Sequence, residues 1–173
     1  EISCSLVGSE MCIRDSNKGV YSLNLRDLSI SKEMMDMFPP DAQIRAMAKD
    51  VQGNIWIAED ELSCYNPKTK KLSRSFSTNQ DGNTRFMLTQ DLLAYGSSML
   101  VGGRTSGVWS FPYHPNNAAH YFKGNQLDFD ELKNKNVSLL YLDSQHYLWV
   151  GTYNMGVYLS LIHISEPTRL QLI

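Results

Sequence analysis

The sequence repeats itself at an interval that few folds can use. Three stretches share one order of features: an alternating apolar run, a turn, a second short apolar run, a small-residue turn and a third run. They are QIRAMAKDVQGNIWIAEDELSCYN from Gln43, TQDLLAYGSSMLVGGRTSGVWSF from Thr89 and NVSLLYLDSQHYLWVGTYNMGVY from Asn136. A fourth, shorter copy, GVYSLN, begins at Gly19. Because alternation with a period of two is typical of strands, each copy predicts a small antiparallel sheet.

The spacing of the copies selects among repeat architectures. Gly19, Glu61, Gly107 and Gly156 hold the same place, directly before the third run of each copy. They recur at about 40–50 residues, which with three or four strands per copy indicates β-propeller blades. Helical solenoids have similar periods, but their repeats carry amphipathic helices and these copies do not. We therefore expect an all-β fold, an incomplete and open β-propeller of about three blades plus a partial one.

Residues that recur in the copies have identifiable physical roles. Trp56 and Trp149 stand between branched apolar residues and are predicted to fill the space between neighbouring sheets. Asp50 and Asp143 are predicted to accept hydrogen bonds from backbone amides two residues ahead and so to set a hairpin turn. His146 occupies a hairpin turn, where histidine tolerates a left-handed backbone better than most residues, and we interpret it as structural.

Other turn residues complete the predicted blade. Gly102, Gly107 and Gly151 are predicted to lie where the chain turns tightly or where strands approach closely. The segment Asn66–Lys70 predicts a turn that leads into Leu72–Phe76, the expected outermost strand of its blade.

Both ends of the chain resemble translated adapter DNA. Leu159–Arg169 is similar to the translated reverse complement of a transposon-based sequencing adapter, and Leu6–Ser16 is similar to the translation of its forward strand. One shared sample barcode accounts for the residues beside both adapter halves. Such scars carry no information on the fold, so His163 is expected to be no ligand. The expected organisation is an adapter-derived artefact at 1–16, a β-propeller repeat fragment at 17–158 and an adapter-derived artefact at 159–173.

Composition excludes several classes of function. The formal net charge is −2, and without the terminal segments acidic and basic residues are equal in number, so nothing favours nucleic acid or an anionic membrane surface. Cys4 and Cys12 belong to the N-terminal segment, which leaves Cys64 without a partner for a disulfide or a CxxC site. No apolar run approaches the roughly 20 residues that span a bilayer. We expect no nucleic-acid partner and no membrane contact within the fragment.

The residues that could carry chemistry do not form a known catalytic or metal motif. His114 and His120 lie six residues apart without an acidic or cysteine partner at a regular spacing, which favours a surface loop over a metal site. The glycine-rich run from Gly102 to Gly107 lies between two predicted strands, whereas a phosphate-binding loop precedes a helix. No serine has a nucleophile-elbow context. The sequence therefore predicts no catalytic residue, no metal site and no cofactor.

One repeated turn offers candidate ligand-binding residues. The turn after each second run carries Glu59-Asp60, Arg104-Thr105 or Tyr153-Asn154. If these turns share one rim of a propeller, they could line the mouth of a ligand site, with aromatic rings stacking on a sugar face. The candidates are Arg104, Tyr153, Asn154 and Glu59.

Two stretches resemble the two-component regulator propeller repeat. They are D-x-x-G-N-I-W-I-A-E, followed by C-Y-N-P-K-T-K-K-L, and L-Y-L-D-S-Q-H-Y-L-W-V-G-T-Y-N-M-G-V-Y. The family pattern is D-x-x-G-x-L-W-I-G-T-x-x-G-L followed by an aspartate- or asparagine-proline turn, and the similarity covers nearly all of 17–158. The copies depart from it where Ala58-Glu59 replaces Gly-Thr, where His146 replaces the turn glycine and where Leu100 replaces the tryptophan.

The resemblance implies the periplasmic sensor region of a hybrid two-component histidine kinase. Such a fragment is expected to sense a small-molecule or oligosaccharide ligand, most simply a carbohydrate, and to signal to a kinase outside it. It is expected to be no enzyme itself, and the parent protein is expected to be a membrane-anchored dimer. Two alternatives stay open. One is a protein-interaction propeller scaffold. The other is a propeller lyase or hydrolase, which would need convergent histidines and carboxylates at the central mouth.

Overall fold

Every regular element of the described chain is a β-strand. The computed structural model describes residues 4–7, 10–15, 19–32, 34, 37–39, 42–59, 62–75, 89–112, 125–127, 130–160 and 170–172. Within these residues, strands β1 to β16 form four antiparallel sheets of four strands each.

The sheets follow one another along the chain. Sheet 1 contains β1 (Cys4–Val7), β2 (Glu10–Asp15), β3 (Gly19–Asn24) and β4 (Ile30–Ser31). Sheet 2 contains β5 (Ala46–Lys49), β6 (Ile55–Ala58), β7 (Leu62–Asn66) and β8 (Lys71–Ser75). Sheet 3 contains β9 (Thr89–Tyr95), β10 (Ser98–Gly103), β11 (Gly107–Pro112) and β12 (Asn125–Gln126). Sheet 4 contains β13 (Val137–Leu142), β14 (Leu148–Thr152), β15 (Val157–Ser160) and β16 (Leu170–Leu172).

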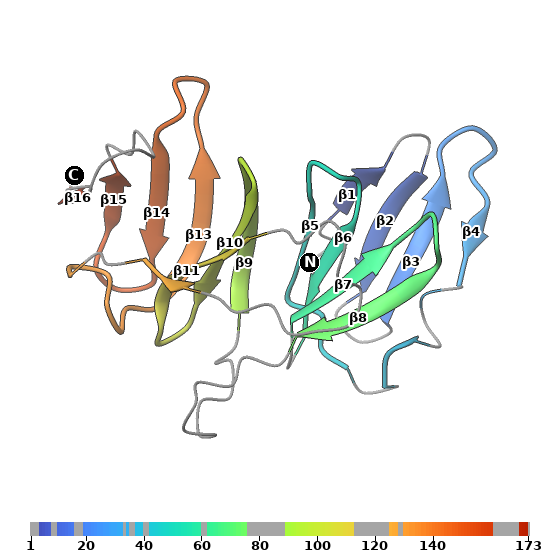
Figure 1. Ribbon diagram of the computed structural model, residues 1–173, viewed down its shortest axis with the longest axis horizontal. Coiled ribbons are helices and arrows are strands. Elements are labelled where there is room, and N and C mark those ends of the chain that lie inside the picture. The colour runs from blue at the N-terminus through green and yellow to red at the C-terminus, as the bar shows by residue number, and fades with distance from the viewer. Residues whose placement is uncertain are drawn as a thin grey trace.

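The sheets stand side by side as propeller blades do. Strands within each sheet are paired in chain order. The first strands of consecutive sheets contact one another, β1 with β5, β5 with β9 and β9 with β13, so the first strand of each sheet lies innermost (Figure 1). This arrangement confirms the predicted all-β class and the incomplete β-propeller. It also confirms that the strand after Asn66–Lys70, β8, is the outermost strand of its sheet.

Parts of the terminal segments take part in the outer two sheets. β1 and β2 lie within 1–16, and β15 continues from Val157 to Ser160 into the segment at 159–173, which also holds β16. His163 lies outside the described residues. Strand pairing does not test the origin of the codons, so the boundaries at 17 and 158 remain a prediction. Val20 of β3, which lies between these boundaries, also packs against sheet 2 and places sheet 1 beside it.

Three apolar clusters fill the spaces between neighbouring sheets. Between sheets 1 and 2 lie Val20, Met34, Phe38, Ile44, Met47, Ile55, Ile57 and Tyr65. Between sheets 2 and 3 lie Ala46, Trp56, Ala58, Leu62, Leu92, Met99, Val101 and Phe111. Between sheets 3 and 4 lie Leu100, Val108, Leu132, Val137, Leu140, Leu148, Val150 and Tyr158.

Successive residues of each second strand point to opposite faces of the sheet and so belong to different clusters. On β6, Ile55 and Ile57 face sheet 1, whereas Trp56 faces sheet 3 and is buried. On β10, Leu100 takes the place of that tryptophan and faces sheet 4. The prediction that Trp56 fills the space between two blades is therefore confirmed, and the replacement at Leu100 preserves the direction of the side chain.

A carboxylate organises the first hairpin of sheets 2 and 4. In sheet 2, Asp50 Oδ1 accepts hydrogen bonds from the backbone N–H groups of Gln52 (2.8 Å) and Asn54 (2.9 Å). Its Oδ2 accepts one from the indole Nε1–H of Trp56 (2.9 Å). The carboxylate thus ties the hairpin turn to the tryptophan that fills the blade interface, and the predicted turn geometry is confirmed.

Asp143 makes the equivalent hydrogen bonds in sheet 4. Its Oδ1 accepts from the N–H groups of Gln145 (2.8 Å) and Tyr147 (2.9 Å), and its Oδ2 accepts from Trp149 Nε1–H (2.8 Å). The bond from Trp149 is the main cause that holds the pKa of Asp143 below its ordinary value of 3.8. Because the folded pKa is lowered, this contribution to stability is present above pH 3.8 and is lost as the pH falls through the folded pKa.

The two hairpins share an unusual backbone conformation. Gly53 has φ of 87° and His146 has φ of 64°, and their N–H groups donate to the carbonyls of Asp50 and Asp143 respectively. His146 therefore occupies the left-handed turn position, as its structural interpretation predicted. Glycine adopts this conformation without strain, whereas histidine tolerates it better than most residues but still at some cost in free energy.

A glycine permits close contact between sheets 3 and 4. A Cβ atom added to Gly102 on β10 would come within 2.7 Å of Val137 Cγ1 on β13. Gly107 has φ of 69°, and a Cβ atom added to it would come within 2.6 Å of the carbonyl oxygen of Leu132. Both glycines lie at the close approaches and turns that the sequence predicted.

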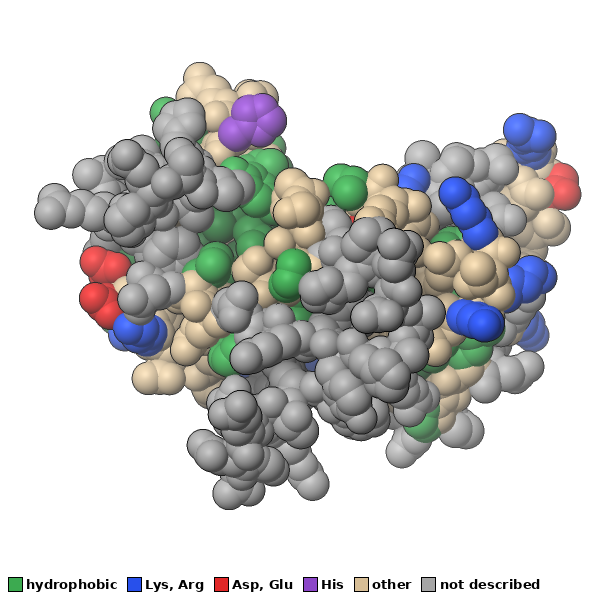
Figure 2. Space-filling view, in the orientation of Figure 1, with side chains coloured by type: hydrophobic (Ala, Val, Ile, Leu, Met, Phe, Trp, Pro, Cys, Tyr) green, Lys and Arg blue, Asp and Glu red, His purple; other side chains and the backbone are tan. Residues whose placement is uncertain are grey.

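Exposed edges of the sheets carry positive charge. Lys32 follows the outermost strand β4, while Lys70 and Lys71 lie at the start of β8, and all three are exposed. Basic side chains gather at the end of the molecule that sheets 1 and 2 form, on the right of the view (Figure 2). Charged side chains on an edge strand disfavour its pairing with another chain.

The hairpin carboxylates lead to a first prediction. We expect Asp50→Ala to lower the free energy of unfolding by about 2–3 kcal/mol, because a buried indole N–H and two backbone N–H groups lose their acceptor. Asp143→Ala is the matched control and should cost less, since its turn and Trp149 are more exposed. Urea unfolding followed by tryptophan fluorescence measures both; equal costs would contradict this account of burial.

The strained turn leads to a second prediction. His146→Gly should raise the free energy of unfolding by about 0.5–1 kcal/mol, since relief of the left-handed conformation exceeds the added chain entropy of glycine. His146→Val should destabilise, because a β-branched side chain fits this conformation worst. Thermal unfolding of the three chains would contradict the assignment if valine were tolerated as well as glycine.

Candidate functional site

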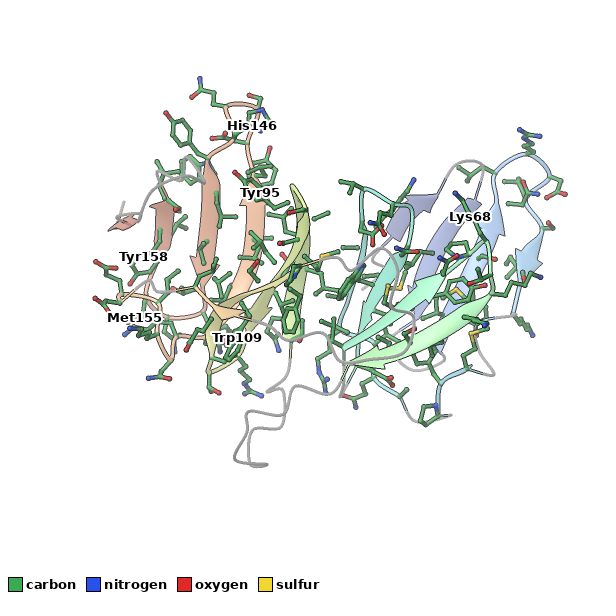
Figure 3. The ribbon with its side chains drawn as sticks, in the orientation of Figure 1. Lys68, Tyr95, Trp109, His146, Met155 and Tyr158 are labelled. Atoms are coloured by element: carbon green, nitrogen blue, oxygen red, sulfur yellow. The ribbon has the colours of Figure 1, made fainter. Side chains whose placement is uncertain are left out.

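The turns that carry the candidate residues lie at one end of the sheets. They join the second strand to the third strand and comprise residue 59, residues 104–106 and residues 153–156 in sheets 2, 3 and 4. Met155 lies at the opposite end of sheet 4 from His146 (Figure 3). We call the side on which Met155 lies the lower rim, and it is the side without the carboxylate hairpins.

A short connecting segment joins the two turns of sheets 3 and 4. The N–H of Gly107 donates to the carbonyl of Lys135 (3.3 Å), and the N–H of Tyr153 donates to the carbonyl of Asn136 (3.0 Å). Because Lys135 and Asn136 are consecutive, the turn with Arg104 and the turn with Tyr153 lie close together. The condition that these turns share a rim is thereby met for sheets 3 and 4.

Exposure separates the candidate residues into two kinds. Arg104, Tyr153 and Asn154 are exposed, and the Tyr153 side chain retains 74% of its accessible surface. Glu59 retains only 7%. The lower rim thus presents a guanidinium, a phenol ring and an amide to solvent, whereas Glu59 has little contact with solvent.

Hydrogen bonds from two segments of the chain hold Glu59 in place. Ser63 Oγ donates to its Oε1 (3.4 Å), and Arg45 Nη1 donates to its backbone carbonyl. Arg45 also donates its own N–H to the carbonyl of Ala58 (2.8 Å). Glu59 therefore helps to hold the segment before β5 against the turn after β6.

The turn with Tyr153 is built by hydrogen bonds within it. Thr152 donates its N–H (3.0 Å) and its hydroxyl (2.8 Å) to the carbonyl of Gly156, and Met155 N–H donates to Thr152 Oγ1 (3.1 Å). These bonds occupy the backbone of the turn and leave the ring of Tyr153 outside it. An exposed ring held on an ordered turn can stack on an apolar face of a ligand.

The turn with Arg104 is anchored from the third strand. The carbonyl of Ser106 accepts hydrogen bonds from Trp109 Nε1–H (2.9 Å) and from Gln126 Nε2–H (2.8 Å). These bonds connect the turn to β11 and β12. The guanidinium of Arg104 offers several N–H donors for ligand oxygens.

The other sequence candidates do not join this rim. His146 lies in the opposite hairpin, and His114 and His120 lie outside the described residues. Among the described residues, no group of three or more His, Cys, Asp or Glu side chains is placed to hold a metal ion. Cys64 is largely buried, and desolvation, with a smaller contribution from the charge of Asp50, raises the pKa of its thiol to about 12.

One polar residue between the blades was not identified from the sequence. Asp91 lies on the innermost strand β9, and its Oδ2 accepts a hydrogen bond from the backbone N–H of Leu140 on β13 (2.7 Å). Its Oδ1 accepts from the N–H of Leu92 (2.9 Å). Burial is the main influence on this carboxyl and raises its pKa above the ordinary value of 3.8. Pairing irregularities lie close by, between Gly102 and Gly103 and between Val137 and Leu139. No local motif marked this residue in the sequence.

Comparison with known families matches the last blade. Residues 131–154 match the family described as Two component regulator propeller. The chain carries a two component regulator propeller repeat. The matched repeat covers β13, β14, the Asp143 hairpin, Tyr153 and Asn154, which confirms the resemblance for the last of the copies.

Solved structures share the fold along the whole chain. The extracellular domain of BT4673 from B. thetaiotaomicron, described as a hybrid two component system, has a TM-score of 0.70 at 17% identity and covers 100% of this chain. PorZ of the type-IX secretion system of Porphyromonas gingivalis has a TM-score of 0.70 at 11% identity over 98% of this chain. A protein described as a gluconolactonase has a TM-score of 0.63 at 14% identity over 95% of this chain. Since an extracellular domain of a two component system and a protein described as a gluconolactonase share the fold, the fold alone does not decide the activity.

The chain corresponds to a small part of these structures. It spans 22% of the BT4673 domain, 26% of PorZ and 59% of the protein described as a gluconolactonase. No curated protein sequence matches it. In the described part of the chain, no helix is long and apolar enough to cross a membrane.

The hydrogen bond between the Asp91 carboxylate and the N–H of Leu140 leads to a third prediction. The pKa of the Asp91 carboxyl is raised in the folded chain, so its contribution to the stability of the fold is present below pH 3.8. That contribution is lost as the pH rises through the folded pKa. Asp91→Asn keeps an acceptor for the Leu140 N–H and removes the charge, so we expect equal or greater stability at pH 7. Asp91→Ala should cost about 1–3 kcal/mol, because that N–H loses its acceptor. Urea unfolding at pH 7 and pH 4 tests both; a less stable Asp91→Asn variant at pH 7 would refute the role of burial.

Proposed function

We propose that this chain is part of the sensor propeller of a hybrid two-component system, that it detects carbohydrate and that it signals to a histidine kinase outside the chain. The observation that carries the proposal is the regulator propeller repeat at residues 131–154. The likeness of the whole chain to the extracellular domain of a hybrid two component system supports it. The propeller would act on the extracellular or periplasmic side of the membrane.

The proposed ligand site is the lower rim between sheets 3 and 4. Tyr153 would stack on the apolar face of a sugar ring, and Arg104 and Asn154 would donate hydrogen bonds to its hydroxyl oxygens. All three side chains are exposed. Glu59 would contribute indirectly, by holding the turn after β6.

The proposal gives the chain a binding role and no catalytic role. The kinase chemistry would belong to another part of the parent protein, which we propose to be a membrane-anchored dimer. Ligand would act by binding one of two propeller arrangements more tightly, for which a coupling of about 1–3 kcal/mol is typical.

The lower rim provides a fourth prediction. In a panel of neutral and acidic oligosaccharides tested by calorimetry, we expect at least one to bind the chain. Tyr153→Ala and Arg104→Ala should each weaken that binding about tenfold, by loss of stacking or of charged donors. Lys68→Ala, in the β7–β8 turn, is a control that should leave it unchanged.

Two results would refute this site. Binding that survives the double variant of Tyr153 and Arg104 would place the ligand elsewhere. Conversion of an oligosaccharide to products by the chain would favour a propeller lyase or hydrolase in place of a sensor.

A further inference from the structure

Three hairpins of sheets 1 and 2 lie on the side of the molecule opposite the lower rim. They connect β3 to β4, β5 to β6 and β7 to β8, and they comprise residues 24–29, 49–54 and 66–71. Because the strands of a sheet are antiparallel and paired in chain order, its first and third turns lie at the same end. All three turns lie at one end of sheets 1 and 2 (Figure 1). We call them the basic hairpins.

Positive charge is concentrated on the basic hairpins. Asp27 is their one exposed acidic side chain, whereas their exposed cations are Arg26, Lys49, Lys68, Lys70 and Lys71. Asp50, the other acidic residue, is buried and accepts hydrogen bonds from its own hairpin. The equivalent described hairpins of sheets 3 and 4, at residues 95–98 and 143–147, carry no lysine or arginine. The net charge of −2 therefore averages over a local excess of positive charge (Figure 2).

Two aliphatic side chains lie among these cations. Leu28 retains 69% of its accessible surface and Val51 retains 72%. Both residues lie in turns and not on strands, so neither belongs to a face on which one sheet packs against another. Binding to an anionic bilayer uses both kinds of side chain, because aliphatic groups enter the headgroup boundary and cations attract the lipid phosphates.

Hydrogen bonds hold Leu28 in an ordered turn. Its N–H donates to the carbonyl of Asn24 (2.8 Å), and the N–H of Asn24 donates to the carbonyl of Ser29 (2.9 Å). Asp27 Oδ1 accepts from the N–H of Ser29 (2.9 Å). Leu28 has φ of 59°, a conformation that is costly for leucine and natural for glycine, and its exposure shows that packing does not offset this cost. Such strained residues concentrate at functional sites.

The turn between β7 and β8 has the same backbone form. Lys70 has φ of 54°, and Asn66 Oδ1 accepts a hydrogen bond from the backbone N–H two residues ahead (3.0 Å), as Asn24 Oδ1 does (2.9 Å). Two neighbouring blades thus hold an aliphatic and an ammonium side chain at equivalent exposed positions.

We propose that the basic hairpins bind the surface of an anionic phospholipid bilayer. The cations contact the lipid phosphates, and Leu28 and Val51 enter the boundary between headgroups and acyl chains. A soluble polyanion would use the cations but would leave the aliphatic side chains without a role. The sequence predicted no membrane contact, because acidic and basic residues are equal in number between the terminal segments, but the fold separates these charges in space. This inference is independent of the ligand proposed for the lower rim.

Cosedimentation of the chain with lipid vesicles tests the proposal. Vesicles of phosphatidylglycerol and phosphatidylcholine in equal amounts are compared with vesicles of phosphatidylcholine alone, and the chain without vesicles is the blank. We expect the partition coefficient for the anionic vesicles to be at least about tenfold higher and to fall as sodium chloride is added.

Charge variants test the location of the surface. Lys68→Gln with Lys70→Gln should weaken binding to the anionic vesicles about 25-fold, at about fivefold for each cation. The matched control, Lys133→Gln with Lys135→Gln, removes the same charge from the segment beside the lower rim. It should change the partition coefficient by less than about twofold, because charges beyond a Debye length of the bilayer are screened.

A glycine variant separates binding from folding. Leu28→Gly removes the aliphatic side chain and relieves the left-handed conformation. We expect it to weaken vesicle binding about fivefold while the free energy of unfolding does not fall.

Three outcomes would overturn the proposal. Equal binding to neutral and anionic vesicles would exclude the cations as its basis. An equal loss in the Lys133 and Lys135 control would assign binding to net charge and not to the basic hairpins. Unchanged vesicle binding of Leu28→Gly, with equally tight binding of dextran sulfate in solution, would identify a soluble polyanion as the partner.

Discussion

The structure depends on burying both faces of each sheet. Successive residues of a strand point to opposite faces, so each second strand supplies side chains to two different clusters. Ile55 and Ile57 pack toward sheet 1, while Trp56 packs toward sheet 3. A sheet of this kind cannot bury its apolar residues alone, and its neighbours complete its core. The stability of each blade is therefore a property of the interfaces as much as of the blade.

The two rims of the sheets have different physical roles. On the opposite side from the lower rim, which we call the upper rim, Asp50 and Asp143 bind the hairpin amides and the indole of a tryptophan, so turn geometry and interface packing are coupled. On the lower rim, the corresponding turns differ from copy to copy. Buried Glu59 holds a neighbouring segment, whereas Arg104 and Tyr153 extend into solvent. The upper rim thus repeats one set of hydrogen bonds in sheets 2 and 4, whereas the lower rim carries different side chains in each copy.

Local patterns predicted the features that depend on local chemistry. The hairpin carboxylates, the interface tryptophan at Trp56 and the left-handed position of His146 follow from spacing, side-chain chemistry and turn geometry. The bridge from Asp91 to the N–H of Leu140 could not be predicted, because its partners are far apart in the chain and meet through the packing of two sheets. The burial of Glu59 was missed for the same reason, since Arg45 reaches its carbonyl from another segment.

The sequence by itself determined the all-β class, the repeat, the outermost strand of the second sheet and the likeness of residues 131–154 to a regulator propeller repeat. These are encoded in alternation and spacing, which act over a few residues. Only the tertiary structure decided which turns are neighbours and which candidate residues reach solvent. Those properties depend on how one sheet lies against the next, and that packing is the sum of contacts between residues distant in the chain.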